Sequence, residues 1–154
     1  MREIRFARGW AALLTVCLAA GCGTQTPTSR AATQSATFNI PPKQLVQDVQ
    51  RIVSSPPLSL GVERVSDGTI VTGWREYRGE LHIVRYWQER TRFHINVIPD
   101  WNEPTARSRL EVGDETEQRA ETRQKWYPAP ELNRPDRAAE VLRQIESQLS
   151  QQPR

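Results

Sequence analysis

The sequence predicts a small two-layer α+β domain: an antiparallel sheet of three to five strands, with an N-terminal and a C-terminal helix packed on one face. Three observations lead to this prediction. Apolar residues recur with helical spacing near both ends of residues 38–150, alternate with polar residues in between, and turn-forming dipeptides separate the alternating runs. The order helix, strands, helix gives this fold when both helices bury their apolar stripes on one sheet.

Residues 1–21 have the features of a secretory signal peptide. Basic residues precede an apolar run from Trp10 to Ala20, about half the roughly 20 residues that a helix needs to cross a bilayer. The run ends in Leu18-Ala19-Ala20-Gly21-Cys22, which resembles a bacterial lipobox: small residues come before a cysteine whose thiol accepts lipid. We therefore expect lipid attachment at Cys22. An ordinary signal peptide with an incidental cysteine is the alternative.

Lipid at Cys22 would anchor the protein to a membrane, because each buried CH₂ of an acyl chain contributes about 0.8 kcal/mol. In the sorting rule of such lipoproteins, Gly23 lacks the aspartate that retains proteins at the inner membrane. This favours the periplasmic face of the outer membrane in a Gram-negative cell. Residues 22–37 are rich in Thr, Ser, Ala and Gln without apolar periodicity, which predicts a flexible tether.

The first helix is expected to begin at Pro41-Pro42, because a missing amide hydrogen costs nothing in a first turn. Ser54-Ser55-Pro56-Pro57 should end it. Between these signals runs one apolar stripe, made of Leu45, Val46, Val49, Ile52 and Val53. We expect this stripe to face the core.

Strands follow, with apolar residues at every second position. Asp67-Gly68 is a strong hairpin signal between residues 61–66 and 69–77. In the second strand one face is expected to carry Ile70, Thr72 and Trp74. A further turn is expected at Arg78-Gly79.

The later strands surround a polar loop at residues 100–104. Residues 81–99 are extended, and the pattern leaves open whether they form one bent strand or two. Residues 106–117 predict a strand with Leu110 and Val112 inward.

Prolines at 128, 130 and 135 break up a connector before the last helix. This helix should open at Pro135, with Asp136 placed favourably in its first turn. Its apolar stripe consists of Ala138, Val141, Leu142, Ile145 and Leu149.

The composition argues against several classes of function. Of 21 basic and 18 acidic residues, three and one lie in residues 1–21, so the rest carries about +1, without the footprint of a duplex nucleic-acid binder. Both cysteines, Cys17 and Cys22, lie near the N-terminus, and His82 and His94 are the two histidines. No metal-ligand spacing, phosphate loop or nucleophile elbow is present. We therefore expect no enzyme, no metal and no cofactor.

Tryptophan and arginine are the residues that point to an interaction. Tryptophans at 74, 87, 101 and 126 could form a recognition patch with arginines, as at many interfaces, or fill a core poor in Phe and Met. Trp101, between Asp100 and Asn102, is the one expected to be exposed. The candidate interaction residues are Trp101, Trp126, Tyr127, Arg90 and Arg92.

Basic and acidic residues alternate closely through residues 85–119. On paired strands they should form ladders of mixed sign, each pair contributing a few tenths of a kcal/mol. Such a face is either simply solvated or a docking face for another protein. Anionic lipid would instead require a cluster of one sign.

Three segments resemble a known family. These are Ile40-Pro41-Pro42 before a helix, the strand pair around residues 67–74, and Arg90-Thr91-Arg92-Phe93 in a later strand. They are similar to small envelope lipoprotein domains, in particular to a lipoprotein component of the bacterial β-barrel assembly machine. The resemblance covers about residues 38–149, room for one such domain. It implies a helix-grip-like fold and a non-catalytic accessory role in outer-membrane protein assembly.

Together these observations predict a lipid-anchored interaction module that docks on an envelope protein complex. The alternative is a module that binds a small ligand or lipid in a pocket between helices and sheet.

Overall fold

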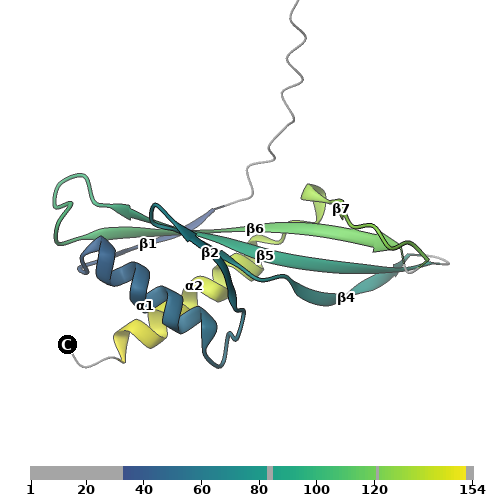
Figure 1. The fold of residues 1–154 in the computed structure, drawn as a ribbon, viewed down its shortest axis with the longest axis horizontal. Coiled ribbons are helices and arrows are strands. Elements are labelled where there is room, and N and C mark those ends of the chain that lie inside the picture. The colour runs from purple at the N-terminus through teal and green to yellow at the C-terminus, as the bar shows by residue number, and fades with distance from the viewer. Residues whose placement is uncertain (1–32, 83–84, 121, 152–154) are drawn as a thin grey trace, which may run out of the picture.

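A computed structural model describes residues 33–82, 85–120 and 122–151 (Figure 1). The predicted signal peptide and the lipobox with Cys22 lie outside these residues. The helices are α1 (Pro42–Ser54), α2 (Pro135–Ser150) and a short 3-10 helix, η1 (Pro130–Leu132). The strands are β1 (Gln34–Phe38), β2 (Val62–Ser66), β3 (Thr69–Thr72), β4 (Arg75–His82), β5 (Arg85–Pro99), β6 (Ser108–Ala120) and β7 (Tyr127–Pro128). None of the described helices is long and apolar enough to span a membrane.

The sheet is larger than predicted. The described residues form a seven-stranded antiparallel sheet, so the prediction of three to five strands was wrong, although the protein is a mixed α+β domain. The order β1-β6-β5-β3-β2 makes up one part, while β4 and β7 extend the sheet along β5 and β6. Strand β7 was not predicted because it has only two residues, and β3 and β4 were predicted as a single strand over residues 69–77.

Strand β1 lies partly inside the segment expected to be a tether. It begins at Gln34 and pairs with β6 from Gln34↔Val112 to Phe38↔Ser108. Ala36 and Phe38 pack against the core, while Ser35 and Thr37 are exposed. The tether prediction was therefore wrong for residues 34–37. Their small and hydroxyl-bearing side chains give no apolar alternation, and the strand is held by backbone pairing with β6.

Both helices bury the predicted stripes on one face of the sheet (Figure 1). Leu45, Val49, Ile52 and Val53 of α1 are buried, as are all five stripe residues of α2; Val46, the fifth residue of the α1 stripe, is partly buried against the core. They meet the inward side chains of the sheet, chiefly Ile70, Phe93, Ile95, Leu110 and Val112. The helices cover only part of that face, and the sheet projects beyond them where β4 and β7 lie (Figure 1). The predictions for both helices and for the inward Leu110 and Val112 are confirmed.

A bulge separates β3 from β4. Val71 pairs with His94, but Arg75 pairs with Thr91, so the β3–β4 side has one more residue than β5 over the same stretch. The amide of Phe93 donates to Thr72 Oγ1 (2.9 Å), which replaces a backbone acceptor. The extra residue reverses the side-chain alternation. The prediction that Trp74 shares a face with Ile70 and Thr72 was therefore wrong.

The region from residue 75 to residue 99 is one hairpin. Of the stretch 81–99, which was left open as one strand or two, residues 81–82 end β4 and Arg85–Pro99 form the single continuous strand β5. The turn predicted at Arg78-Gly79 was wrong, because both residues lie within β4. The register instead shifts between Arg78 and Leu81.

Candidate interaction site

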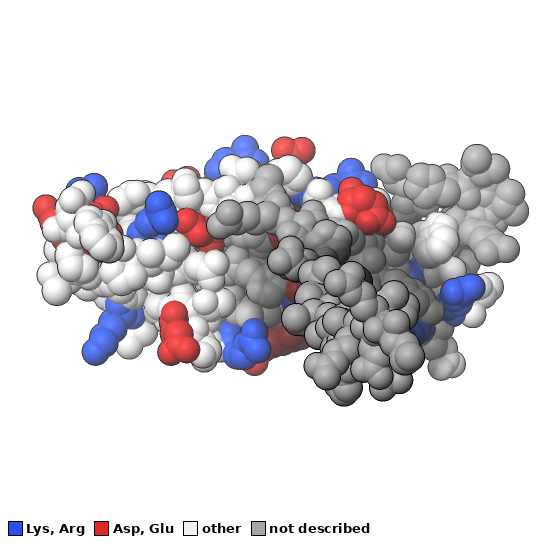
Figure 2. All heavy atoms as spheres, turned by 90° about the horizontal axis from the view of Figure 1, so that it is seen from above, with Lys and Arg blue, Asp and Glu red and all other residues white. Residues whose placement is uncertain are grey.

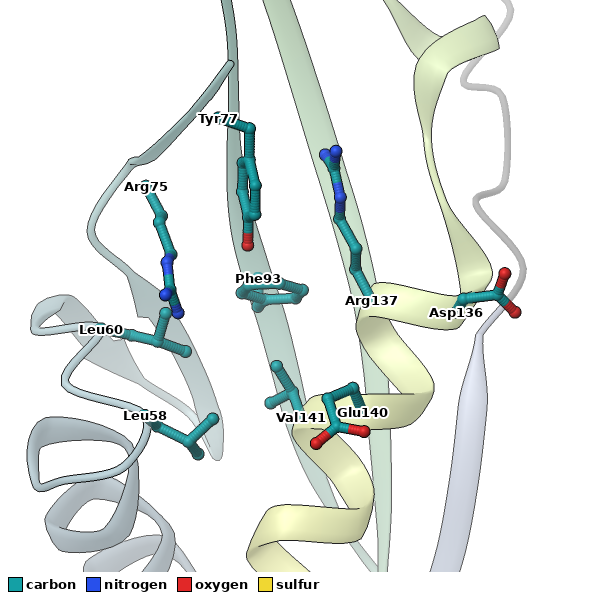
Figure 3. Close-up of a pocket in the computed structure, with 9 residues that line it drawn as sticks. All are labelled: Leu58, Leu60, Arg75, Tyr77, Phe93, Asp136, Arg137, Glu140 and Val141. Atoms are coloured by element: carbon teal, nitrogen blue, oxygen red, sulfur yellow. The ribbon is translucent and has the colours of Figure 1, made fainter. Parts of the chain in front are cut away.

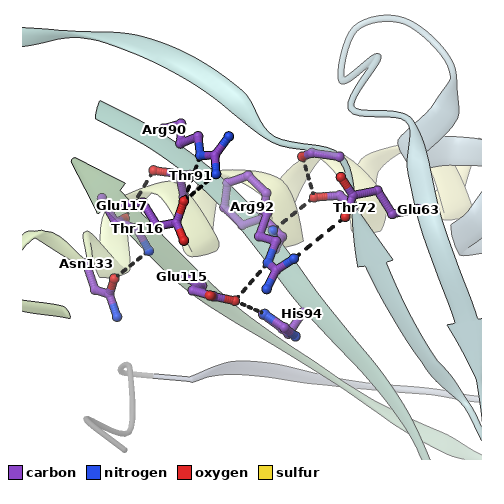
Figure 4. Close-up of polar contacts among 12 residues, drawn as sticks. Glu63, Thr72, Arg90, Thr91, Arg92, His94, Glu115, Thr116, Glu117 and Asn133 are labelled. Atoms are coloured by element: carbon purple, nitrogen blue, oxygen red, sulfur yellow. Dashed lines mark hydrogen bonds and ion pairs between the residues drawn. The ribbon is translucent and has the colours of Figure 1, made fainter. Parts of the chain in front are cut away.

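The sheet face opposite the helices carries cross-strand ion pairs between β5 and β6. Arg90 Nε donates to Glu117 Oε2 at 2.8 Å, and Arg92 Nε donates to Glu115 Oε2 at 2.8 Å (Figure 4). The register pairs Arg90 with Glu117 and Arg92 with Glu115, so the predicted ladders of mixed sign are confirmed. Basic and acidic side chains are interspersed on the part of this face that grey atoms leave visible (Figure 2).

Two tryptophans stack on this ladder. The guanidinium carbon of Arg90 lies 4.4 Å from the ring centre of Trp74 and 4.5 Å from that of Trp126. Arg92 lies 4.5 Å from the Trp74 ring, and Arg119 lies 4.5 Å from the Trp126 ring. We call these five residues the arginine–tryptophan ladder. The core-filling interpretation is wrong for both tryptophans, because each packs on arginines outside the hydrophobic core.

Glu115 joins the ladder to His94. Its Oε2 lies 2.7 Å from His94 Nε2 and also accepts from Arg92 (Figure 4). Burial acts to raise the pKa of Glu115, but the hydrogen bonds and charges of Arg92 and His94 outweigh it and lower that pKa. The same hydrogen bond raises the pKa of Arg92 against the opposing effect of burial. Glu115 thus binds both Arg92 and His94 on this face of the sheet. No cluster of three potential metal ligands occurs among the described residues.

A second polar network holds the start of α2 to β6. The helix has no side-chain cap of its own, and Asp114 Oδ2 accepts from the amide of Arg134 at 2.8 Å. The amide of Thr116 donates to Asn133 Oδ1 (3.0 Å), and its carbonyl accepts from the amide of Ala129 (2.9 Å). A carboxylate at a helix N-terminus also complements the helix dipole. This network fixes the place at which α2 begins.

Next to this network lies a cleft of about 320 Å³ between α2, β4 and the segment after α1 (Figure 3). Its apolar lining consists of Leu58, Leu60, Phe93 and Val141, and its polar lining of Arg75, Tyr77, Asp136, Arg137 and Glu140. Arg137 is fully engaged: it donates to Thr91 Oγ1 (2.8 Å) and Glu89 Oε2 (3.3 Å) and stacks on the Tyr77 ring (3.9 Å). The cleft therefore combines an apolar floor with a polar rim.

Trp101 stands apart from both regions. It lies in the loop between β5 and β6, and its side chain is 96% exposed. The loop is held by hydrogen bonds from the Asn102 amide to Asp100 Oδ1 (2.9 Å) and from the Asp100 amide to the Arg107 carbonyl (2.9 Å). The exposure expected for this residue is observed. An ordered turn presents the indole to solvent beside a shallow hollow that Ile98 and Arg109 help to line.

The structure thus brings together three of the five candidate interaction residues. Arg90, Arg92 and Trp126 belong to the arginine–tryptophan ladder. Tyr127 follows on β7, 40% exposed, with Lys125 5.6 Å from its ring centre. Trp101 lies in a separate loop.

Sequence reasoning did not identify the residues of the cleft, although the alternative function expects a pocket between helices and sheet. Its residues come from the segment after α1, from β4 and β5, and from α2, and no local spacing unites them. The one available signal was Leu58 and Leu60, two apolar residues outside any predicted element.

Comparisons with known proteins identify no family. No protein-family model matches the chain, and a search of curated proteins finds no match.

Proposed function

We propose that this protein is a lipid-anchored, periplasm-facing module of the outer membrane that binds another envelope protein and catalyses no reaction. Cys22 is the proposed lipid attachment site. The resemblance to envelope lipoprotein domains supports an accessory role in outer-membrane protein assembly. The single observation that carries the interaction role is the exposure of Trp101.

An indole held in water by an ordered loop is costly unless a partner covers it. A packed aromatic side chain buries about 150–250 Å², which at about 25 cal/mol per Å² is roughly 4–6 kcal/mol before the costs of association. Tryptophan is enriched among the residues that dominate binding energy. The hydrogen bonds of Asp100 lower the entropic cost of binding, because the loop is already ordered.

The test is crosslinking in native cells. A photoreactive amino acid at position 101 should capture one envelope protein, whereas the same group at Lys43, an exposed residue of α1, should not. Cys22→Ser should abolish the capture, because the anchor is lost. Trp101→Ala should weaken binding of the captured partner by about 2 kcal/mol, or roughly 30-fold. Equal capture from positions 101 and 43 would contradict the proposal.

The cleft supports the alternative function, binding of a small ligand or lipid. It lies between helix and sheet, where that alternative expects a pocket. Its volume of about 320 Å³ is at the lower end of the range for ligand pockets, which is about 300–1,000 Å³. Native mass spectrometry of the protein purified from its own cells tests this alternative, which predicts a co-purifying ligand.

A further inference from the structure

The outer edge of β4 is unpaired in the described part of the chain. Strand β4 pairs with β5 on one side, from Arg75↔Thr91 onward. On the other side β2 pairs only with β3, and this pairing ends at Val62↔Thr72. An edge strand presents unpaired N–H and C=O groups that can hydrogen-bond another extended backbone.

The cleft opens beside the start of this edge. Arg75 and Tyr77 of β4 line it, and so do Leu58 and Leu60 of the segment that precedes β2 (Figure 3). Side chains alternate along a strand, so a strand added to β4 would direct every second side chain toward the cleft. Glu76 lies between the two lining residues of β4 and faces the opposite side of the sheet.

Two charged side chains at the start of β4 lack ion-pair partners among the described residues: Arg75 on the cleft face of the sheet and Glu76 on the opposite face. Arg75 is exposed and has no ion-pair partner among the described residues; its guanidinium carbon lies 5.8 Å from the centre of the Tyr77 ring. Glu76 is exposed and has no ion-pair partner among them. Two other charges of the cleft are engaged, since Arg137 bonds to Glu89 and Glu140 to Arg143. Asp136 also lines the cleft, but its carboxylate is directed away from Arg75 and Tyr77 (Figure 3).

We propose that the β4 edge and the cleft bind an extended peptide segment of a partner protein by strand addition. An apolar side chain of the peptide enters the cleft over Phe93. An acidic side chain two residues away pairs with Arg75, and a basic side chain between them lies beside Glu76. Backbone hydrogen bonds supply affinity in this mode of binding, and pockets for alternate side chains supply specificity. This inference rests on the proposed interaction role and names the class of partner.

A free lipid or fatty acid fits these observations less well. It would fill the apolar floor and could place a carboxylate on Arg75. It would leave the backbone groups of β4 to water and would ignore Glu76. The exposed edge and the two opposite free charges therefore favour a peptide.

The probe is a fluorescein-labelled peptide of sequence Thr-Val-Glu-Lys-Leu-Thr-Val, titrated with the full chain in detergent and followed by fluorescence anisotropy. Saturable binding is expected. N-methylation of the peptide amides that face β4 should abolish binding, whereas N-methylation of the alternate amides should leave it intact, because only alternate amides bond to a neighbouring strand. Equal effects at both sets of amides would overturn the proposal.

Charge exchange tests the register. Arg75→Glu should weaken binding about tenfold, and replacing the peptide glutamate by lysine should restore it. Lys43→Glu is the matched control, since it makes the same change of charge on exposed α1 and should leave binding unchanged. Failure of the exchanged peptide to recover binding to the Arg75→Glu variant would contradict the assigned contact.

Two further arms separate the possible outcomes. Displacement of the peptide by dodecanoate, with no dependence on N-methylation, would overturn the proposal and assign the cleft to a lipid. Trp101→Ala should leave peptide binding unchanged, because Trp101 lies on a different loop. Peptide binding without crosslinking at position 101 would refute the proposed Trp101 contact alone, and crosslinking without peptide binding would refute this inference alone.

Discussion

Replacing Arg90 by lysine should destabilise the domain even though the positive charge is kept. The planar guanidinium lies between two indole rings, 4.4 Å from the centre of Trp74 and 4.5 Å from that of Trp126. It also bonds to Glu117 through Nε at 2.8 Å and Nη2 at 2.5 Å. An ammonium group cannot lie flat against two rings or offer a planar pair of donors.

The expected loss is about 1–2 kcal/mol of unfolding free energy. A cation–π contact contributes about 0.5–1 kcal/mol when exposed and about 2 kcal/mol when desolvated. The side chain of Arg90 is 25% exposed and that of Glu117 17%, so the site lies between these limits. Lysine keeps the charge and one hydrogen bond but loses stacking on at least one ring.

Urea unfolding followed by circular dichroism measures this difference. A double-mutant cycle with Trp126→Ala should give a coupling of about 0.5–1 kcal/mol, because the two side chains are in contact. Arg109→Lys is the control, since Arg109 pairs with Glu111 at 52% exposure without a stacked ring, and its effect should stay within about 0.5 kcal/mol. If Arg90→Lys changed stability as little as this control, or if the two changes were additive, the stacking argument would be refuted.

Three further predictions concern stability, and urea titration measures each of them. Because folding lowers the pKa of Glu115, its carboxylate stabilises the folded state above its ordinary pKa of 4.5, and this stabilisation is lost as pH falls through the pKa of the folded state. The Glu115→Gln variant should therefore have a lower unfolding free energy than the wild type at pH 7 and should lose less of it as the pH is lowered. If the unfolding free energy of Glu115→Gln fell with pH as steeply as that of the wild type, this prediction would be contradicted. Asp114→Ala should cost about 1 kcal/mol, because it removes the acceptor at the start of α2; a cost near zero would show that water replaces it. Gly68→Ala should cost more than about 1 kcal/mol, because φ is +79° and the new Cβ would lie 2.8 Å from the Val97 carbonyl oxygen, whereas Gly113→Ala, with nothing within 4 Å, should stay within about 0.5 kcal/mol. Equal effects of the two alanines would contradict this last argument.

The helices and the longest strands were predictable because their signals are local. A stripe such as Leu45, Val49 and Ile52 recurs with helical period, and alternation along Phe93 and Ile95 has the period of a strand. Asp67-Gly68 forms the predicted hairpin turn, with Asp67 at φ 49° and Gly68 at φ 79°. Local geometry alone decides these features, so one stretch of sequence is enough to indicate them.

The missed strands lacked such a signal. In β1, Gln34–Phe38, the order depends on hydrogen bonds to β6, which lies far along the chain. At the break between β3 and β4, one extra residue reversed the alternation of the side chains that follow at the start of β4, which moved Trp74 from the expected inner face to the arginines. Alternation shows which residues share a face but not where a bulge changes the phase.

The sequence by itself determined the two amphipathic helices, the Asp-Gly hairpin, the alternation of β5 and β6 and the exposure of Trp101, because each depends on neighbours within a few residues. Only the tertiary structure decided the stacking of Arg90 between Trp74 and Trp126, the cleft over Phe93 and the open edge of β4. These features join segments that are distant in the chain, and their existence depends on strand order and register, which no local periodicity specifies.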